Sequence, residues 1–320
     1  MNKDTWIVIV NPKAGSGKVE KDWSEISNYF SLCELSHEIL FTKHKYHAVE
    51  LTVQSVRQGY RNFVSVGGDG TISEIVDGFF IQKVVPVTDL CLSVIPAGTG
   101  NDWMRMYNVN STYEDAVNLV KSGSHHTQDV GYFRLCDHKV ILDRTMVNVA
   151  GLGYDADVCY YSNAIKQKGK ITKQGKTIYI KAAIKALFKR KSKHYRITVD
   201  DKIFYEGQVF SCAFGIGKYS GGGMQQMPDA VVDDGLINIT VIKKANILKI
   251  LMNFSKLFSG KIYDTYPLVD HTMGKNIHVD VISKKGVIGD IYENLEIDGE
   301  VFLACNLDLE CINKGLNVIY

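Results

Sequence analysis

Residues 64–71 constrain the fold of this chain most, because they join an apolar run to a glycine-rich turn and then to a helical pattern. The run at 63–66 has the composition of a buried strand, and 72–80 has the period of a helix. The turn, Gly67-Gly68-Asp69-Gly70, lets the backbone approach a ligand closely. A helix start offers free N–H groups and partial positive charge to an anion. The turn therefore predicts a phosphate site, with Asp69 placed to meet a metal ion or a nucleotide hydroxyl.

A second interpretation of this turn needs no ligand. Thr71, followed three residues later by Glu74, has the pattern of a capping box that closes the N–H groups of a helix start. This pattern accounts for Thr71 and Glu74 but leaves Gly67, Gly68 and Asp69 unexplained. Phosphate binding and simple helix capping both remain open on the turn alone.

Strand and helix patterns alternate over the first 130 residues and predict an α/β domain. Strands are expected at 5–10, 39–42, 63–66 and 90–95, and helices at 21–32, 46–58, 72–80 and 113–121. This alternation indicates a parallel sheet with helices on its faces, where ligands bind at the carboxyl ends of the strands. The glycine-rich loops after the first, third and fourth strands all fall at that edge.

The pattern becomes rich in strands after Asp129 and predicts a second, largely antiparallel domain. We assign 1–130 to the first domain and 131–305 to the second, and the sequence leaves open whether strands in 306–320 return to the first. Strands are expected at 140–150, 195–199, 203–210, 236–242, 276–282 and 295–297, and helices at 178–191 and 245–258.

Composition excludes several classes of protein. No run approaches the roughly 20 apolar residues that span a bilayer, and the N-terminus lacks a signal-peptide pattern. The seven cysteines form no C-x-x-C pair, which favours free thiols in a reducing cytosol over zinc ligation or disulfides. We therefore expect a cytoplasmic protein.

Basic residues are concentrated in one segment. Residues 158–199 hold 12 of the 37 lysines and arginines and no acidic residue. Within it, Lys181, Lys185 and Lys189 share one face of a predicted helix, and apolar residues at 180, 184 and 188 share another. This pattern predicts peripheral binding to an anionic membrane, and the alternative is a helix packed on the second domain with solvated lysines. No aromatic-rich module supports nucleic-acid binding.

Two more loops at the predicted sheet edge carry groups that suit phosphate or metal. The loop 11–18 is not a Walker A motif, because Pro12 stands where that motif needs glycine and Val19 where it needs serine or threonine. It is either a phosphate contact or an ordinary surface loop. The loop 96–102 again combines glycines with a carboxylate, Asp102. Asp129 is either a solvated turn residue or a partner of Asp69 and Asp102 in a Mg²⁺ and water network.

Two acidic turns stand out in the second half. Asp233-Asp234-Gly235 is either a polar turn or a cation site built from Asp234 and backbone carbonyls. Asp298-Gly299 is a common hairpin turn, and a carboxylate there is also able to serve as general base toward a hydroxyl.

Taken in order, these loops resemble the diacylglycerol kinase catalytic family, in particular its soluble bacterial lipid kinases. The resemblance covers essentially the whole chain and rests on Asn11-Pro12, on 67–71, 96–102 and 228–236, and on Asp298-Gly299-Glu300. It implies an N-terminal nucleotide domain and a C-terminal β-sandwich. One Gly-Gly-Asp-Gly alone is shared with NAD kinases and phosphofructokinases.

The resemblance also implies roles for individual residues. Asp298 would be the base toward the lipid hydroxyl. Asp69, Asp102 and Asp129 would organise catalytic Mg²⁺, and Asp234 with the carbonyls of Val231 and Leu236 would hold a structural Mg²⁺. The residues expected to bind ATP are Asn11, Thr42, Gly67, Gly68, Asp69, Gly70, Thr71, Ile72, Ser73 and Thr99.

The function that follows is phosphoryl transfer from ATP to a lipid hydroxyl, with diacylglycerol as the first candidate. Phosphatidylglycerol and sphingoid lipids are alternatives, because hydrophobic pockets discriminate acyl chains weakly. A soluble kinase of the NAD-kinase kind is a further alternative, and it would leave the basic helix and the 228–236 loop without a role. A nucleotide-binding regulator without turnover is disfavoured, because Asp69, Asp102 and Asp298 are all present. The sequence does not indicate the oligomeric state.

Overall fold

The computed structural model describes residues 4–98, 100–107, 112–137, 140–167, 175–283, 286–289 and 291–320. The chain divides into two compact units, one formed by Met1–Val130 with Asn313–Tyr320 and the other by Gly131–Ile312. Two strands, β5 (His125–Asp137) and β17 (Asn306–Ile319), contribute residues to both units. Over the described residues, no helix combines the length and the apolar character needed to cross a bilayer.

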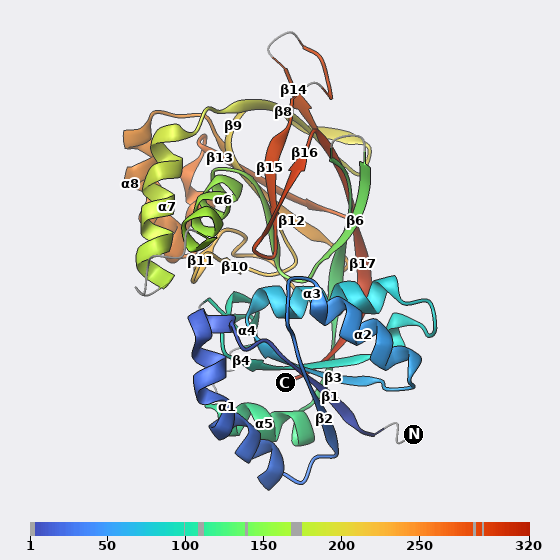
Figure 1. The fold of residues 1–320 in the computed structure, drawn as a ribbon. Coiled ribbons are helices and arrows are strands. Elements are labelled where there is room, and N and C mark those ends of the chain that lie inside the picture. The colour runs from blue at the N-terminus through green and yellow to red at the C-terminus, as the bar shows by residue number, and fades with distance from the viewer. Residues whose placement is uncertain are drawn as a thin grey trace. The chain divides into compact units, whose positions relative to one another are not determined.

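The first unit is a parallel sheet covered by helices on both faces, with α1 and α5 on one face and α2 and α3 on the other (Figure 1). Its strands lie in the order β4-β3-β1-β2, and the end of β17 pairs in parallel with β4. Its elements are β1 (Trp6–Val10), α1 (Ala14–Leu32), β2 (His37–Phe41), α2 (His47–Arg57), β3 (Asn62–Gly67), α3 (Asp69–Ile81), η1 (Val87–Asp89), β4 (Cys91–Pro96), α4 (Asp102–Arg105) and α5 (Tyr113–Ser122).

Both faces of this sheet are buried, which explains why its strands are continuous apolar runs. Val8 and Val64 lie in the core that α1 closes with Ile26 and Phe30. On the other face Phe63 packs edge-on against Phe79 of α3, with the ring centroids 5.0 Å apart. The α/β prediction for the first domain is confirmed.

Two helices of this unit begin earlier than the sequence predicts. α1 begins at Ala14, but Gly15, Ser16 and Gly17 have left-handed backbone angles, so a kink separates the loop from the regular helix. α3 begins at Asp69, directly after β3, and therefore includes most of the glycine-rich turn in its first turn. The turn that we predicted as a loop is a helix start.

The second unit is built from antiparallel strands around one apolar core. Strand β9 is central, because its first half pairs with β8 and its last residues lie between β7 and β12. Its elements, besides β5 and β17, are β6 (Val140–Met146), β7 (Val149–Gly153), α6 (Tyr154–Gln167), α7 (Gly175–Lys189), β8 (Lys193–Val199), β9 (Lys202–Gly215), β10 (Tyr219–Ser220), β11 (Met224–Gln225), β12 (Ile237–Lys243), α8 (Ile247–Phe258), η2 (Ile262–Thr265), β13 (Val269–Gly274), β14 (Asn276–Ile282), β15 (Glu293–Ile297) and β16 (Glu300–Ala304).

One helix of this unit, α6, is absent from the sequence prediction. Its segment is rich in tyrosine and small polar residues and has no clean apolar stripe. The helix is stabilised by packing on α7, where Val158 meets Ala182 and Ala186, and the hydroxyl of Tyr154 donates to the Ala183 carbonyl at 3.2 Å. Tertiary contact, rather than local pattern, explains this helix.

Candidate functional site

The predicted phosphate loops of the first unit lie together at the carboxyl edge of its sheet. Strands β3 and β4 are neighbours in register from Asn62 and Cys91 to Gly67 and Pro96, so the loops that follow them emerge side by side. A Cβ added at Gly98 would lie 2.5 Å from the Cα of Gly68, and one added at Gly68 would lie 3.1 Å from the Cα of Gly98. The two loops therefore touch backbone to backbone, and a side chain at position 98 would force them apart.

Asn11 joins the loop after β1 to this pair. Its Nδ2 donates to the Thr71 Oγ1 at 3.1 Å, and its Oδ1 accepts from the Lys13 backbone N–H at 3.1 Å. The Asn11 backbone N–H donates to the Val66 carbonyl at 3.0 Å, which extends the ladder between β1 and β3. Asn11 thus fixes two predicted nucleotide-binding segments relative to each other.

The start of α3 has no side-chain cap. Its N-cap is Gly68, which has no side chain to accept from the first N–H groups. The capping box expected at Thr71 and Glu74 is wrong, because Thr71 lies within the first turn and its hydroxyl accepts from Asn11. Glu74 instead accepts from the backbone N–H groups of Tyr46 and Ala48, at 3.0 and 3.1 Å, and so caps α2.

Asp69 and Asp102 form a pair of neighbouring carboxylates beside this helix start. A Cβ at Gly100 would lie 3.5 Å from Asp102 Oδ2 and 3.6 Å from Asp69 Oδ2. Loss of water and the negative charge of Asp102 raise the pKa of Asp69 to about 6, although Asp69 accepts from two backbone N–H groups of α4. Asp102 is balanced by the Arg105 Nε at 3.1 Å from its Oδ1. The carboxylates of Asp69 and Asp102, on either side of Gly100, offer oxygen ligands of the kind that a hard cation prefers.

Asp129 does not converge directly with this pair. It is fully buried, and its Oδ1 accepts from the Lys314 backbone N–H at 2.6 Å, where β17 has a left-handed residue with φ 49°. It is therefore not the solvated turn residue that one interpretation expected. Within the described part of the chain, Asp69, Asp102 and Asp129 do not form a cluster whose ligand atoms lie within 4.8 Å of one another. A water-mediated link between Asp129 and the pair stays a prediction.

The remaining predicted nucleotide residues differ in what they present. Thr42 follows β2, and its backbone N–H donates to the Val10 carbonyl at 2.9 Å. Ile72 and Ser73 are buried within α3, so their side chains pack inside the unit. Gly70 lies in the exposed first turn of α3 with open space where a Cβ would be. Thr99 lies outside the described residues.

In the second unit, Asp298 is buried at the turn of the β15–β16 hairpin. Asp298 and Gly299 both have positive φ, 46° and 89°, the geometry of a tight two-residue hairpin turn. The Asp298 Oδ2 accepts from the Val147 N–H at 2.8 Å, and its Oδ1 accepts from Asn148 and Val149 at 3.0 and 3.1 Å. The carboxylate thus anchors the segment between β6 and β7, a structural role that the sequence did not predict.

The predicted structural cation site at Val231, Asp234 and Leu236 is an exposed turn. The Asp234 Oδ1 accepts from the Leu236 backbone N–H at 2.9 Å, which is the hydrogen bond of an Asx turn. Asp234 and Val231 are exposed. The turn interpretation accounts for this geometry, and the cation site stays a prediction.

Two further groupings were not predicted. In the first unit, ligand atoms of His44, His47 and Glu50 lie within 4.8 Å of one another. However, the His47 Nδ1 accepts from the Lys43 backbone N–H at 3.0 Å, which occupies one of its two ring nitrogens. The sequence signal was weak, because His44 precedes α2 and only His47 and Glu50 lie on the helix, three residues apart.

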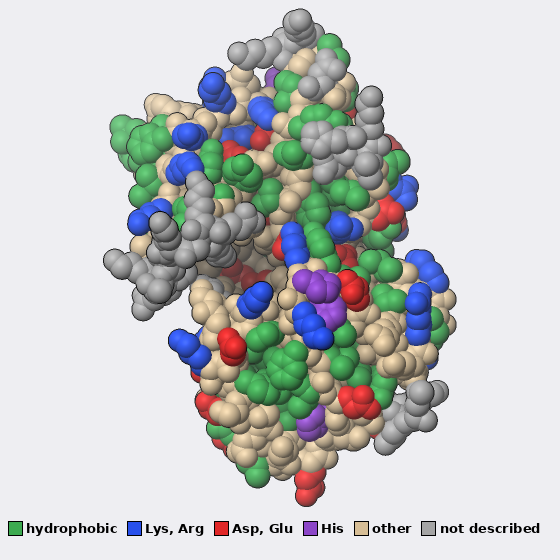
Figure 2. All heavy atoms as spheres, in the orientation of Figure 1, with side chains coloured by type: hydrophobic (Ala, Val, Ile, Leu, Met, Phe, Trp, Pro, Cys, Tyr) green, Lys and Arg blue, Asp and Glu red, His purple; other side chains and the backbone are tan. Residues whose placement is uncertain are grey.

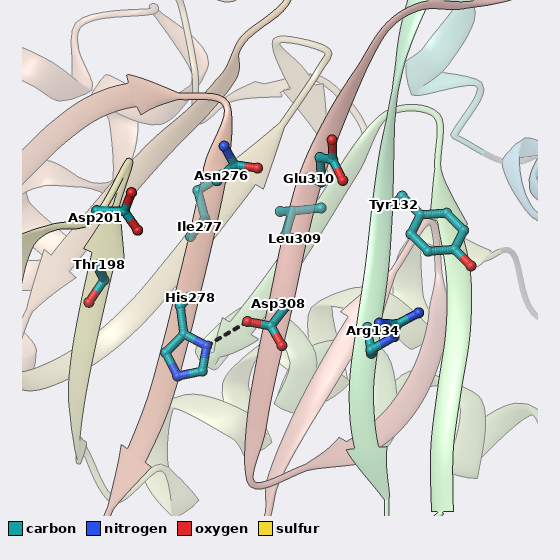
Figure 3. A pocket seen from close by; sticks show the side chains of 10 residues that line it. All are labelled: Tyr132, Arg134, Thr198, Asp201, Asn276, Ile277, His278, Asp308, Leu309 and Glu310. Carbon is teal, nitrogen blue, oxygen red and sulfur yellow. Dashed lines mark hydrogen bonds and ion pairs between the residues drawn. The ribbon is translucent and has the colours of Figure 1, made fainter.

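The second grouping lines a hollow of about 350 Å³ on the second unit (Figure 3). Among its lining residues, His278 is held by Asp308 at 2.6 Å and also by Asp280 at 3.1 Å. Partial burial alone would lower the pKa of His278, but the two carboxylates raise it overall. The residues lining the hollow are Tyr132, Arg134, Thr198, Asp201, Asn276, Ile277, His278, Asp308, Leu309 and Glu310.

Comparison with known proteins gives matches over nearly the whole chain. Residues 5–133 match the diacylglycerol kinase catalytic domain, and residues 148–320 match the YegS C-terminal NAD kinase beta sandwich-like domain. A diacylglycerol kinase of Staphylococcus saprophyticus is 24% identical over 293 residues, which cover 92% of this chain and 88% of that protein. One of Staphylococcus epidermidis is 27% identical over 247 residues, covering 77% of this chain and 70% of that protein.

Solved structures give the same fold. The crystal structure of a diacylglycerol kinase from Bacillus anthracis superposes with a TM-score of 0.71 at 21% identity, and covers 100% of this chain and 98% of that one. Yeast NADH kinase in complex with NADH superposes with a TM-score of 0.53 at 10% identity, covering 100% of this chain and 83% of that one. The predicted pairing of an α/β nucleotide domain with a C-terminal β-sandwich is thereby confirmed.

Proposed function

Because the chain belongs to the diacylglycerol kinase family of lipid kinases, we propose that it transfers the γ-phosphoryl group of ATP to a lipid hydroxyl, with diacylglycerol as acceptor and phosphatidic acid as product. The observation that carries this proposal is the uncapped start of α3, packed through Gly68 against Gly98 and tied to the loop after β1 by Asn11. This arrangement presents backbone N–H groups to an anion at the carboxyl edge of a parallel sheet.

Phosphoryl transfer needs positioning and neutralisation of charge more than covalent work by the protein. The N–H groups and the dipole of α3 supply part of that positive potential. Asn11 and Thr71 hold the two loops at fixed distance, so that the phosphate site is formed before the nucleotide arrives. Thr42 and Thr99 are proposed as further nucleotide contacts.

Asp69 and Asp102 fit the proposed Mg²⁺, because their carboxylate oxygens flank the small residue Gly100. When bound, Mg²⁺ would neutralise charge on the phosphate oxygens. Arg105 keeps Asp102 oriented, and the backbone of α4 does the same for Asp69. Asp129 is proposed to join them through water, and Asp234 with the carbonyls of Val231 and Leu236 to hold a second, structural Mg²⁺.

Asp298 is proposed as the general base toward the acceptor hydroxyl, in keeping with the family resemblance. Its three backbone hydrogen bonds fix the carboxylate in one orientation, which a positioned base requires.

The lipid is proposed to be reached at an anionic membrane surface. Exposed lysines of α7 at 181, 185 and 189 support this, since each basic residue near such a surface contributes about 1 kcal/mol.

The decisive experiment supplies labelled ATP with diacylglycerol, phosphatidylglycerol, a sphingoid base and NAD, each in separate detergent-micelle assays. We expect labelled phosphatidic acid from diacylglycerol with Mg²⁺ present. Labelled NAD with no labelled lipid would overturn the lipid-kinase proposal in favour of an NAD-kinase-like enzyme. Label on another lipid alone would retain the lipid kinase and change its acceptor.

The base is tested by Asp298→Asn in the same assay. Because this variant places an amide where the carboxylate accepts three N–H groups, its thermal unfolding and its binding of a fluorescent ATP analogue are measured in parallel. We expect nucleotide binding to persist while turnover falls by two or more orders of magnitude, roughly the scale of general-base loss. Turnover equal to that of wild type would rule out the base assignment.

A further inference from the structure

Helix α8 exposes a row of large apolar side chains. Leu248, Leu251 and Met252 have relative exposures of 68%, 51% and 73%, and Phe258 at the end of the helix has 50%. Spacings of three and four residues place the first three on one face of the helix. Figure 2 shows hydrophobic side chains gathered where α8 lies in Figure 1, with lysine and arginine side chains beside them.

The fold does not need this face for its own stability. The opposite side of α8 carries Ile250 and Leu257, which are buried, and Leu257 packs with Met224, Ile262 and Leu268 in a small core. Asn246 caps the helix by accepting from the Lys249 N–H at 2.8 Å. The helix is therefore fixed by its inner face and cap, and its outer apolar face is a surface in its own right.

The charged side chains on α8 and on the described part of α7 are all basic. α8 contains Lys249 and Lys256 and no acidic residue, and α7 contains three exposed lysines and no acidic residue in its described part. α7 also exposes Ile180, Ile184 and Phe188, at 58%, 53% and 73%. Among the described side chains, no carboxylate forms an ion pair with a lysine of α8 or with the exposed lysines of α7.

Both helices pack on the same short segment of the second unit. The site of a Cβ on Gly221 lies 2.5 Å from the Tyr179 hydroxyl of α7 and 2.3 Å from the Met224 Cε. Met224 is also part of the core beneath α8. The lysines of α7 and the apolar face of α8 are thus held on one body of the fold.

We propose that the outer face of α8 inserts into the headgroup region of an anionic bilayer, with Leu248, Leu251 and Met252 among the acyl chains and the lysines of α7 and α8 at the phosphates. An apolar stripe rimmed by lysines, without acidic residues, has the composition of an interfacial helix. A second copy of this chain is a poorer occupant, because a symmetric contact through this face would bring the lysines of both copies together. The choice of a lipid surface rests on the proposed lipid-kinase function.

The first test distinguishes vesicle binding through apolar insertion from binding through the charges of the lysines. Wild type and L248S/L251S/M252S are sedimented with vesicles of phosphatidylserine and phosphatidylcholine that contain neither diacylglycerol nor ATP. High salt screens the lysines but not apolar insertion, so we expect residual wild-type binding in high salt that the triple variant lacks. At low salt we expect binding at least about tenfold weaker for the triple variant, since partial burial of three such side chains contributes that much or more.

The matched control is I141S/I203S/M273S, which removes three apolar side chains of similar exposure, 67%, 63% and 48%, from strands of the same unit. It is expected to bind vesicles like wild type. Equal loss in both triple variants, or no loss in the α8 variant, would overturn the proposal. A wild-type dimer in sedimentation velocity that L248S/L251S/M252S converts to a monomer, with vesicle binding unchanged, would assign the face to self-association instead.

Insertion is measured directly with M252W. We expect its emission to be quenched by vesicles whose acyl chains carry bromine, whereas I203W is not quenched. An unquenched M252W on vesicles to which the protein is bound would contradict insertion. Turnover on diacylglycerol in detergent micelles is measured for each variant, so that a failure of the kinase proposal is distinguished from a failure of membrane docking.

Discussion

The Asn11 Nδ2 lies 3.1 Å from the Thr71 Oγ1, although the two residues are 60 positions apart in the chain. This bond links the loop after β1 to the first turn of α3. Since Gly67 and Gly68 lie directly before that turn, the bond also holds the glycine-rich segment in place. This side-chain contact therefore helps to hold the proposed phosphate site together.

We expect T71V to raise the KM for ATP by roughly tenfold, because valine has the shape of threonine but leaves the part-buried Asn11 amide without its acceptor, a loss of about 1–2 kcal/mol. T71S keeps the hydroxyl and is expected to bind ATP nearly as wild type does. Steady-state kinetics at varied ATP, with thermal unfolding alongside, measure the effect. An unchanged KM in T71V would show that the bond is not needed for nucleotide binding.

The contact between Gly68 and Gly98 predicts that a side chain at position 98 is destabilising, whereas a side chain at Gly70 meets no neighbour. In G98A the new Cβ would lie 2.5 Å from the Gly68 Cα, so the two loops must separate, at a cost of about 1–3 kcal/mol. In G70A nothing lies within 4 Å of the new Cβ, and alanine favours a helical first turn. Denaturant unfolding is expected to show G98A destabilised and G70A equal to or more stable than wild type. Equal stability of G98A and wild type would refute the close approach.

The cap that Glu74 provides for α2 predicts a stability effect unconnected with Thr71. E74A leaves the N–H groups of the N-cap residue Tyr46 and of Ala48 in α2 without their acceptor and is expected to cost about 1–2 kcal/mol. E74Q keeps one acceptor oxygen and should cost less. If Thr71 and Glu74 formed a capping box, T71V and E74A would be strongly coupled. We expect their effects on unfolding free energy to add, and a large coupling term in the double-mutant cycle would contradict this assignment.

His278 predicts a pH-dependent contribution to stability. Asp308 and Asp280 raise its folded-state pKa above the ordinary value near 6.5, so its stabilising effect is full below that value and is lost as the pH rises through the folded-state pKa. H278Q should therefore lower the Tm more at about pH 5.5 than at about pH 9. D308N removes one partner and is expected to shrink this difference. A Tm loss in H278Q that is independent of pH would exclude the ion pair as its cause.

Local patterns predicted much of the first unit. The buried strands and the helices α2, α3 and α5 follow from apolar runs and helical periods, and their bounds agree to within a few residues. The position of the glycine-rich loops that we predicted to bind phosphate followed from topology, because the carboxyl ends of parallel strands share one edge. Counting charges identified the basic segment. For α8 the sequence predicted a helix but not its exposed apolar face.

The failures share a cause. The capping box at Thr71 and Glu74 was inferred from their spacing of three residues, whereas the hydrogen-bond partners of Glu74 lie 26 and 28 residues away. Helix α6 lacks a clean stripe and is held by α7. The structural hydrogen bonds of Asp298 were missed for the same reason, because their donors lie about 150 residues earlier in the chain, whereas its role as a base stays a prediction. No window along the sequence contains these partners.

Local sequence was enough to predict most of the element types, the glycine-rich loops and the residues able to meet phosphate or metal, because backbone propensity and apolar period act over a few neighbouring residues. Which of these residues meet depends on the tertiary structure. The contact of Gly68 with Gly98, the bond of Asn11 to Thr71 and the pairing of Asp69 with Asp102 all depend on strand neighbours that the chain brings together over long separations. A hydrogen bond or a steric contact acts over about 3 Å of space whatever the separation in sequence, and that distance is set by packing.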